Sequence, residues 1–451
     1  MTYRTRLVPL LTVLAVVALP AIALDIACIG SSCDEPAAAS SEVPFCSLPA
    51  PLREDLAAGY REQRSPDVLT VPGEPVLWGW DGGGQRGVDP AWPSANDPPS
   101  GRVPIVFAGT GVHPNAPIPD GAGLDAVAPT LLEALGSDWA FPGVHPGEPI
   151  AVTSTERARL VLVVALKGIG SAELEAQPRA WPFLRSLLRE GSGTLEGDAG
   201  SLPLDPAATL TTIGTGATPA DHGITGTWLR NDDRGGALAR AWSAEAPLSV
   251  IATFADDLEY DGPFAGSARI GLVADDPADL GLVGRDWYAV GDRDEVTLAR
   301  PGETETATGR LLADGFGGDA TPDVLGAVVR DSIPAMDDQL RGIVERARAA
   351  SGDRLLVSVV GTGSATGPVR GRATIPVDQL IRAADDAVPG EAAAVEWSQP
   401  GGLFLDQEAL VAAGVGSGTA VQAMLGSRQP DGTALLADAF GGFAVQFGRF
   451  C

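Results

Sequence analysis

Histidine is scarce in this sequence, with three residues among 451: His113, His145 and His222. His113 and His145 lie in stretches rich in proline and glycine, where a surface position is expected, and His222 lies in an Asp-His-Gly-Ile stretch that predicts a capped turn. Most zinc hydrolases take several of their metal ligands from imidazoles. The low histidine count therefore excludes most zinc-hydrolase sites and leaves sites of carboxylates alone, of the kind that bind calcium or magnesium.

Common catalytic motifs are missing as well. The sequence contains no G-x-S-x-G elbow and no Walker phosphate loop, which are the usual signatures of serine hydrolases and ATPases. Residues 361–367 have the spacing G-x-G-x-x-x-G and no helix pattern follows them, which indicates a loop rather than a dinucleotide site. Three aspartates share one loop without a recognisable ligand spacing: Asp81, Asp89 and Asp97. We therefore predict no metal and no cofactor.

The N-terminus predicts export. Two arginines precede an apolar run over residues 7–24, and the run contains Ala-Ile-Ala at 21–23, a pattern that signal peptidase accepts. The run approaches the length of a membrane span, so an uncleaved anchor is the alternative. Two prolines inside the run and the cleavage pattern favour a signal peptide over residues 1–23. Asp25 argues against lipidation of Cys28, because an aliphatic residue is needed shortly before that cysteine.

Cysteine occurs four times, at Cys28, Cys33, Cys46 and Cys451. The sequence has no C-x-x-C motif and no histidine near any of the four, which argues against a thiol redox role and a metal site. An even number of cysteines in an exported chain indicates disulfides. Four cysteines allow three pairings, of which we favour a local Cys28–Cys33 bond and a long-range Cys46–Cys451 bond.

The bulk composition is that of a large folded protein. Hydrophobic residues make up 45% of the chain, which is enough for a large core and too much for general disorder. Residues 24–45 are rich in Ala, Ser, Glu and Pro and predict a flexible tether. The formal net charge of -27 repels nucleic acid and anionic lipid. We expect an extracytoplasmic protein without nucleic-acid partners and without a membrane span once the signal is cleaved.

Strand and helix patterns alternate along the chain and predict a doubly wound α/β sheet. Arg159–Leu166 and Arg354–Val360 are apolar runs typical of central parallel strands. Residues 225–320 contain short strand patterns and many turns, which predict a cap subdomain. The other expected strands are 67–71, 76–80 and 103–108, and the expected helices are 52–63, 123–135, 180–190, 208–215 and 335–350.

One segment resembles a known family. Gly200–Gly226 is similar to the alkaline phosphatase superfamily, and most closely to its type I phosphodiesterase and nucleotide pyrophosphatase branch. Thr215–Ile224 matches the branch's signature T-G-x-x-P-x-x-H-G-I. Leu160–Gly168 resembles the family's first strand, and Arg354–Gly363 resembles the strand that normally ends in Asp-His-Gly. The resemblance implies a three-layer α/β/α sandwich with a mostly parallel central sheet and a small cap.

A second resemblance is out of order. Residues 64–69, 102–107 and 126–131 resemble the end of the family's domain, yet here they come first. The resemblance therefore implies a circular permutation, which is tolerated where the original termini lie close together. It implies a single domain over 46–451, with a permuted part at 46–136, a connector at 137–158, and a first-strand part at 159–451 with the cap at about 225–320. The join would bring Cys451 close to Cys46.

The family binds two zinc ions through Asp and His side chains and uses Thr or Ser as nucleophile. Carried over position by position, these groups are missing. The first-strand Asp falls on Lys167, the nucleophile on Pro206 beside Asp205, and the Asp-His pair on Gly361 and Thr362.

Two further positions depart from the family. A Lys and an Arg that some members use on the phosphate fall on Asp275 and Pro277. A shift of one position in the alignment would offer Thr209 or Thr211 as nucleophile, but it would not supply the missing histidines.

We therefore predict a degenerate cleft lined by Lys167, Asp205, Gly361 and Thr362, with no assigned catalytic residue. We expect Lys167 to pair with Asp205 as a structural replacement for the metal charge. The resulting hypothesis is a secreted, metal-free pseudoenzyme with a binding or structural role in the envelope or outside it. The alternative is a secreted hydrolase of phosphate or sulfate esters with altered active-site chemistry.

Overall fold

A computed structural model describes residues 44–72, 77–79, 101–285, 287–288, 294–363, 374–390, 392–428, 431–448 and 451. Ala39–Cys451 is one compact unit. The predicted signal peptide, most of the tether, and Cys28 and Cys33 lie outside the described residues. No helix within the described residues is long and apolar enough to cross a membrane.

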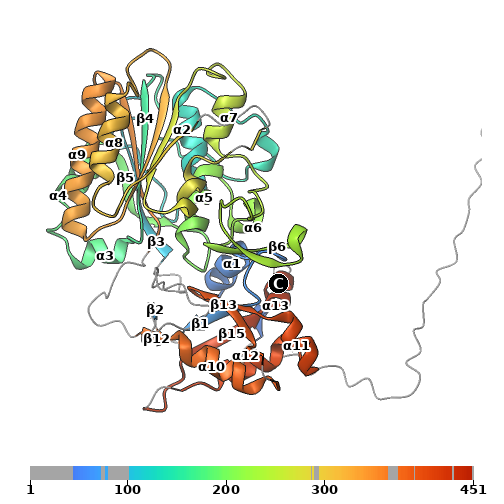
Figure 1. Cartoon of the computed structure of the whole chain (residues 1–451). Helices are drawn as coiled ribbons and strands as arrows, with labels where there is room; N and C mark the ends of the chain where they lie inside the picture. Colours follow the sequence, from blue (N-terminus) through green and yellow to red (C-terminus); the bar gives the residue numbers. More distant parts are fainter. Residues whose placement is uncertain are drawn as a thin grey trace, which may run out of the picture. The chain divides into compact units, whose positions relative to one another are not determined.

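The largest sheet has seven strands in the order β5-β3-β11-β4-β10-β8-β9 (Figure 1). The strands from β11 to β9 are parallel to one another, whereas β3 runs antiparallel to both of its neighbours. This mixed, mostly parallel sheet confirms the predicted α/β class. The strand bounds are β3 (Arg102–Gly109), β4 (Leu160–Leu166), β5 (Ser192–Asp198), β8 (Ile270–Ala274), β9 (Glu295–Leu298), β10 (Asp323–Val329) and β11 (Leu355–Gly361).

Helices cover both faces of this sheet, which gives three layers (Figure 1). Every residue of the central strand β4 is buried, as expected for a parallel strand with helices on both sides. Alternate β4 residues enter two different cores: Val161 and Val163 pack with α2, α5 and α7, and Leu160 and Leu162 pack with α4, α8 and α9. The helix bounds are α2 (Val127–Leu135), α4 (Pro182–Glu190), α5 (Pro206–Thr215), α7 (Phe254–Tyr260), α8 (Thr304–Ala313) and α9 (Ile333–Ser351).

A second, antiparallel sheet has the strand order β13-β14-β1-β15. It shares a separate hydrophobic core with α10 and α12, which includes Val68, Leu403 and Met424. The strand bounds are β1 (Val68–Pro72), β13 (Val395–Gln399), β14 (Gly402–Leu405) and β15 (Leu436–Gly441). The helices in this part are α10 (Val377–Ala387), α11 (Gln407–Ala413) and α12 (Ser417–Leu425).

The remaining elements are short. Two two-stranded sheets pair β2 (Leu77–Gly79) with β12 (Thr374–Pro376), and β6 (Trp228–Asn231) with β7 (Ala237–Arg240). The remaining α-helices are α1 (Ala50–Ala58), α3 (Ser171–Ala176), α6 (Pro219–His222) and α13 (Gly442–Gly448). The 3₁₀ helices are η1 (Phe45–Ser47), η3 (Leu124–Ala126), η4 (Pro142–Val144), η5 (Asp232–Arg234) and η6 (Pro277–Leu282).

The cap expected at about 225–320 needs a correction. This range contributes β8 and β9 to the seven-stranded sheet, so it does not form a separate subdomain. The separate smaller hydrophobic core is formed instead by β1 and by elements after residue 376. The sequence did not reveal β8 as a strand of the main sheet because β8 has only five residues. Turn-rich segments on both sides of β8 made its apolar run hard to recognise.

The two ends of the folded region meet. Cys46 and Cys451 form a disulfide with a Cα–Cα distance of 5.5 Å across a sequence separation of 405 residues. Next to this bond the ring of Phe45 packs edge-on against Phe440, with 5.1 Å between ring centroids. The predicted Cys46–Cys451 pairing is therefore confirmed.

Candidate functional site

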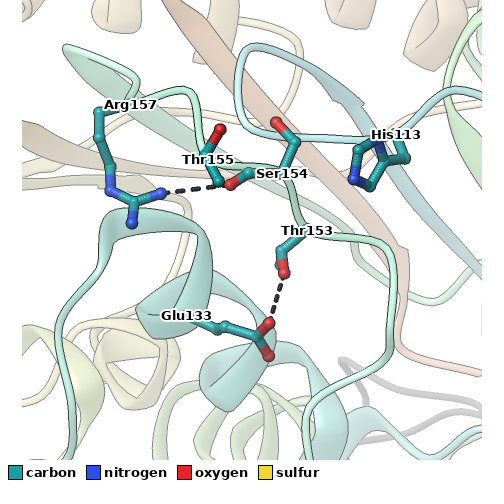
Figure 2. Close-up of a pocket in the computed structure, with 6 residues that line it drawn as sticks. All are labelled: His113, Glu133, Thr153, Ser154, Thr155 and Arg157. Carbon is teal, nitrogen blue, oxygen red and sulfur yellow. Dashed lines mark hydrogen bonds between the residues drawn. The ribbon is translucent and has the colours of Figure 1, made fainter.

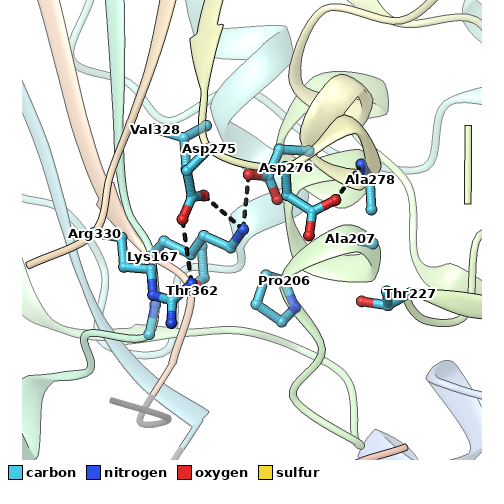
Figure 3. A network of polar contacts seen from close by, with 12 residues as sticks. Lys167, Pro206, Ala207, Thr227, Asp275, Asp276, Ala278, Val328, Arg330 and Thr362 are labelled. Atoms are coloured by element: carbon cyan, nitrogen blue, oxygen red, sulfur yellow. Dashed lines mark hydrogen bonds and ion pairs between the residues drawn. The ribbon is translucent and has the colours of Figure 1, made fainter. Parts of the chain in front are cut away.

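Four polar residues lie where four adjacent parallel strands end. Lys167 follows β4, Asp275 follows β8, Arg330 follows β10 and Thr362 follows β11. Figure 3 shows these residues in one polar network together with the start of α5. The carboxyl edge of a parallel sheet is the usual place for ligand sites in α/β proteins, so this network is the candidate functional site.

Lys167 occupies the centre of the network. Its Nζ lies 2.9 Å from Asp275 Oδ1 (Figure 3). The same Nζ lies 2.7 Å from Asp279 Oδ2. The side chains of Lys167 and Asp279 are 1% exposed and that of Asp275 is 4% exposed. On its other side Asp275 Oδ2 accepts a hydrogen bond of 3.2 Å from Arg330 Nη1. The network therefore contains a buried cation held by two buried carboxylates.

The identity of this cation is unusual for the chain. Of its 31 basic residues, Lys167 is the only lysine, and the others are arginines. An arginine presents a planar fork of donors, whereas a lysine presents a compact charge at the end of a flexible stem. Among the described ion pairs, Lys167 is the cation whose single nitrogen contacts two buried carboxylates at once.

The protonation states follow from burial and charge. Burial lowers the pKa of the Lys167 ammonium, but Asp279 and Asp275 outweigh this effect and hold the pKa above its usual value. Burial acts to raise the pKa of Asp279, and the Lys167 ammonium 2.7 Å away acts to lower it. Burial also acts to raise the pKa of Asp275, yet Lys167 and Arg330 keep it below its usual value. Lys167 therefore remains charged at neutral pH, which excludes it as an amine nucleophile or a general base.

Asp205 caps the helix that enters the site. Its Oδ1 accepts hydrogen bonds from the Ala207 backbone N–H at 2.9 Å and from Thr227 Oγ1 at 3.0 Å. An acidic N-cap satisfies a free backbone donor and complements the positive end of the helix. Asp205 therefore lies at the helix terminus, where an anionic ligand would otherwise be attracted.

The expected ion pair between Lys167 and Asp205 stays a prediction. Lys167 pairs with Asp275 and Asp279, while the described contacts of Asp205 include the α5 backbone and Thr227. The N-cap position holds the Asp205 carboxylate against its own helix, and η6 places Asp279 within 2.7 Å of Lys167.

Gly361 and Thr362 join the exits of β11 and β4. Thr362 Oγ1 accepts a hydrogen bond of 2.8 Å from the Gly168 backbone N–H, and the Thr362 backbone N–H lies 3.3 Å from Leu166 O. At Gly361 an added Cβ would lie 2.3 Å from Ile169 O, so a side chain does not fit there. Of the predicted site residues, the structure thus brings Lys167, Gly361 and Thr362 together at neighbouring strand ends.

The threonines considered as alternative nucleophiles use their hydroxyls within α5. Pro206 occupies the first helical position. Thr209 and Thr211 are fully buried, and their hydroxyls donate to the backbone carbonyls of Asp205 at 3.2 Å and Ala207 at 2.7 Å. Both hydroxyls therefore bond to the backbone of their own helix.

The buried histidines have other partners. His222 is fully buried, and its Nδ1 accepts a hydrogen bond of 3.0 Å from the Ile224 N–H, as expected for a turn residue. Burial lowers the pKa of His222 to about 3, so its ring is neutral. His145 stacks on Trp139 with 3.6 Å between ring centroids, and it is buried rather than on the surface as expected.

The third histidine lines a hollow of about 310 Å³ at the opposite, amino edge of the parallel strands (Figure 2). Thr153 Oγ1 donates to Glu133 Oε1 there at 2.5 Å, and Arg157 Nη1 donates to the backbone carbonyls of Ala134 and Ser154. His113 is exposed, as expected. The Arg157 guanidinium thus already binds backbone at this hollow, which contains none of the predicted site residues.

The zinc pair that the resemblance implies does not fit these residues. Within the described part of the chain, no group of three or more His, Cys, Asp or Glu side chains is arranged to hold a metal ion. Lys167 replaces an acidic ligand with a cation, and its Nζ lies between the two nearest carboxylates. A positive charge at that point repels a metal ion.

Sequence reasoning missed four polar residues of the network: Thr227, Asp276, Asp279 and Arg330. One signal was available for Arg330, because it directly follows a buried parallel strand, as Lys167 and Thr362 do.

A scan of protein-family models finds no match to this chain, and a search of curated proteins finds no similar one.

Proposed function

We propose that this protein is a non-catalytic, metal-free and secreted member of the alkaline phosphatase superfamily, from its phosphodiesterase branch, with a binding or structural role. The observation that carries the proposal is the burial of Lys167 between Asp275 and Asp279, where the network supplies its own cation. The positions that resemble the family's metal ligands and nucleophile hold Lys167, Pro206, Gly361 and Thr362 instead.

The charges at this edge compensate one another. Arg330 pairs with Asp275, and Arg240 pairs with Asp276 through a contact of 2.5 Å. Asp205 lies on the start of α5, so the helix end already has a carboxylate partner. Two-metal hydrolysis needs cations that remain open to the attacking and leaving oxygens. A site whose cations are already neutralised favours a role other than that chemistry.

A circular permutation is part of the proposal. It requires that segments from the two ends of the chain pack as parts of one fold, and the Cys46–Cys451 bond is consistent with this. Arg61 Nη1 donates to the backbone carbonyls of Ala220 and Asp221, and Arg64 Nη1 donates to that of Gly223. Arg61 and Arg64 belong to the part that the proposed permutation has moved ahead of β4. Their contacts show that this part packs against the end of the signature segment, Thr215–Ile224.

The test measures metal content and turnover on one purified preparation. Bis(4-nitrophenyl) phosphate and 4-nitrophenyl sulfate serve as substrates, with an active two-zinc phosphodiesterase as positive control. We expect no stoichiometric zinc and no turnover above the buffer rate. Zinc bound at one or two equivalents, with turnover that is lost in Lys167→Met or Asp205→Asn, would sink the proposal.

The alternative, a hydrolase of phosphate or sulfate esters with altered chemistry, rests on a different observation. The side chains of Arg240 and Arg330 are 38% and 37% exposed, so two guanidinium groups at this edge retain access to an anionic ester. Metal-independent turnover that falls at least tenfold in Arg330→Gln and persists in the surface control Arg346→Gln would favour this alternative.

A further inference from the structure

We infer that Asp275 and Asp279 form a cation site that the ammonium group of Lys167 fills permanently, so that removing the amine opens the site to a hydrated divalent cation. The inference rests on the proposed metal-free cleft and extends it, because it assigns the cation that takes the metal's role. It does not concern the family's zinc positions, because Asp275 and Asp279 do not resemble its metal ligands.

The geometry is that of a bound cation. Two carboxylate oxygens from different elements, the exit of β8 and the middle of η6, converge on one atom at 2.9 and 2.7 Å. Both carboxylates are almost fully buried. Like charges so close together repel, and burial without compensation costs several kcal/mol for each ion. A cation between them is therefore a requirement of this arrangement.

The choice of residue supports the same interpretation. A chain with a single lysine among 31 basic residues places that lysine here. The ammonium group is compact and strongly hydrated and carries three donors, so it is the side-chain group closest to a small inorganic cation. A guanidinium would bind one carboxylate as a flat fork and would leave the other without an in-plane partner.

The frame around the lysine is built from other residues. Arg330 holds Asp275 Oδ2, and the Asp276 carboxylate caps η6 by accepting the Ala278 N–H at 2.9 Å. The Asp279 backbone N–H also donates to Asp276 O at 3.1 Å. These contacts do not involve the lysine side chain, so they are expected to keep both carboxylates in place when the amine is removed.

The chemistry of the site selects the ion. Its donors are carboxylate oxygens, which suit magnesium and calcium better than zinc. Magnesium commonly binds through one or two carboxylates and retains several waters. Lys167→Ala would leave room for a hydrated ion where the ammonium and part of the stem were, whereas Lys167→Met would fill the same volume without charge.

The experiment compares the wild type, Lys167→Ala, Lys167→Met and the double variant Lys167→Ala/Asp279→Asn. Thermal unfolding and titration calorimetry are measured with MgCl2, CaCl2 or NaCl at matched ionic strength. We expect the wild-type melting temperature to be the same in all three salts. Lys167→Ala should melt lower, regain much of the loss in millimolar magnesium or calcium, and bind one ion per chain. The double variant should bind that ion at least tenfold more weakly.

Three outcomes would overturn the inference: a folded Lys167→Ala that neither binds nor is stabilised by either ion, equal ion binding by the double variant, or equal binding by the wild type. If Lys167→Ala folds only when magnesium or calcium is present, the inference is supported. If it folds in no salt while Lys167→Met folds, the ion does not replace the amine and the inference fails. These results are independent of ester turnover, which tests the proposed function alone.

Discussion

Arg230 donates two hydrogen bonds to Asp67 Oδ2, from Nη2 at 2.8 Å and from Nε at 3.3 Å. The same carboxylate accepts the Leu405 N–H at 2.8 Å and, through Oδ1, a hydrogen bond from Gln407 Nε2 at 2.8 Å. One ion pair thus ties the β6–β7 hairpin to the entry of β1 and to the end of β14. It joins segments separated by 163 and 338 residues in sequence.

Replacement of Arg230 by Ala should destabilise the protein markedly. The side chains of Arg230 and Asp67 are 13% and 20% exposed, so the loss of one partner leaves a largely buried charge, at a cost of about 3 kcal/mol. Equilibrium unfolding in urea measures the difference. The matched control is Arg346→Ala, whose pair with Glu305 is 58% and 32% exposed and should cost about 0–1 kcal/mol. Equal effects of the two variants would contradict the role given to Arg230.

Reduction of the Cys46–Cys451 bond should lower the free energy of unfolding by about 2–5 kcal/mol. The bond closes a loop that spans nearly the whole folded region, so its loss increases the conformational freedom of the unfolded chain. The measurement is thermal unfolding with and without dithiothreitol. A Cys46→Ser/Cys451→Ser variant should melt lower than the wild type and be insensitive to the reductant. The prediction fails if this variant melts at the wild-type temperature.

The central parts of the fold were accessible from the sequence because they are locally encoded. The apolar runs predicted β4 and β11 to within one residue, and α5 and α9 begin two residues before their expected starts. The small sheet was not accessible, because β1 pairs with strands more than 300 residues away and β14 has only four residues. The partners of Lys167 were missed for the same reason, since Asp279 lies 112 residues further along the chain.

Lys167→Met should destabilise the protein by about 3–5 kcal/mol, because it leaves Asp275 and Asp279 buried without their cation. Adding Asp279→Asn should recover part of this loss, since one buried carboxylate is then neutral. Urea unfolding of the two single variants and the double variant gives the coupling free energy between the residues. Additive effects would show that the 2.7 Å contact contributes no coupling.

A single lysine also makes the charge of the site directly measurable. Protein grown with [13Cε]lysine should give one lysine signal, because Lys167 is the only lysine in the sequence. Asp279 and Asp275 hold the pKa of Lys167 above its ordinary value, so the chemical shift should remain that of the ammonium form beyond pH 10.5, the ordinary value. Unfolding in urea should return the titration to the ordinary range. A signal that titrates near neutral pH in the folded protein would contradict the charged state.

Asp55 on α1 should make stability fall as pH rises from about 4 to 8. Burial raises the pKa of Asp55 to about 7, and the nearby Asp198 and Glu54 carboxylates add to the rise. Because the folded pKa lies above the ordinary value of 3.8, the contribution of this group is fully present below pH 3.8 and is lost as pH rises through 7. Asp55→Asn should therefore be more stable than the wild type at pH 8, by on the order of 1 kcal/mol for this partly exposed group.

The measurement for Asp55 is urea unfolding of the wild type and the variant at pH 5 and at pH 8. The two proteins should differ less at pH 5, where Asp55 is still protonated in the folded wild type and only part of its contribution is lost, than at pH 8, where all of it is lost. Glu54→Gln is the neighbouring control and should shift the wild-type curve only slightly, because Glu54 is the last of the three causes of the raised pKa. A stability difference between wild type and Asp55→Asn that is the same at both pH values would show that Asp55 does not titrate in this range.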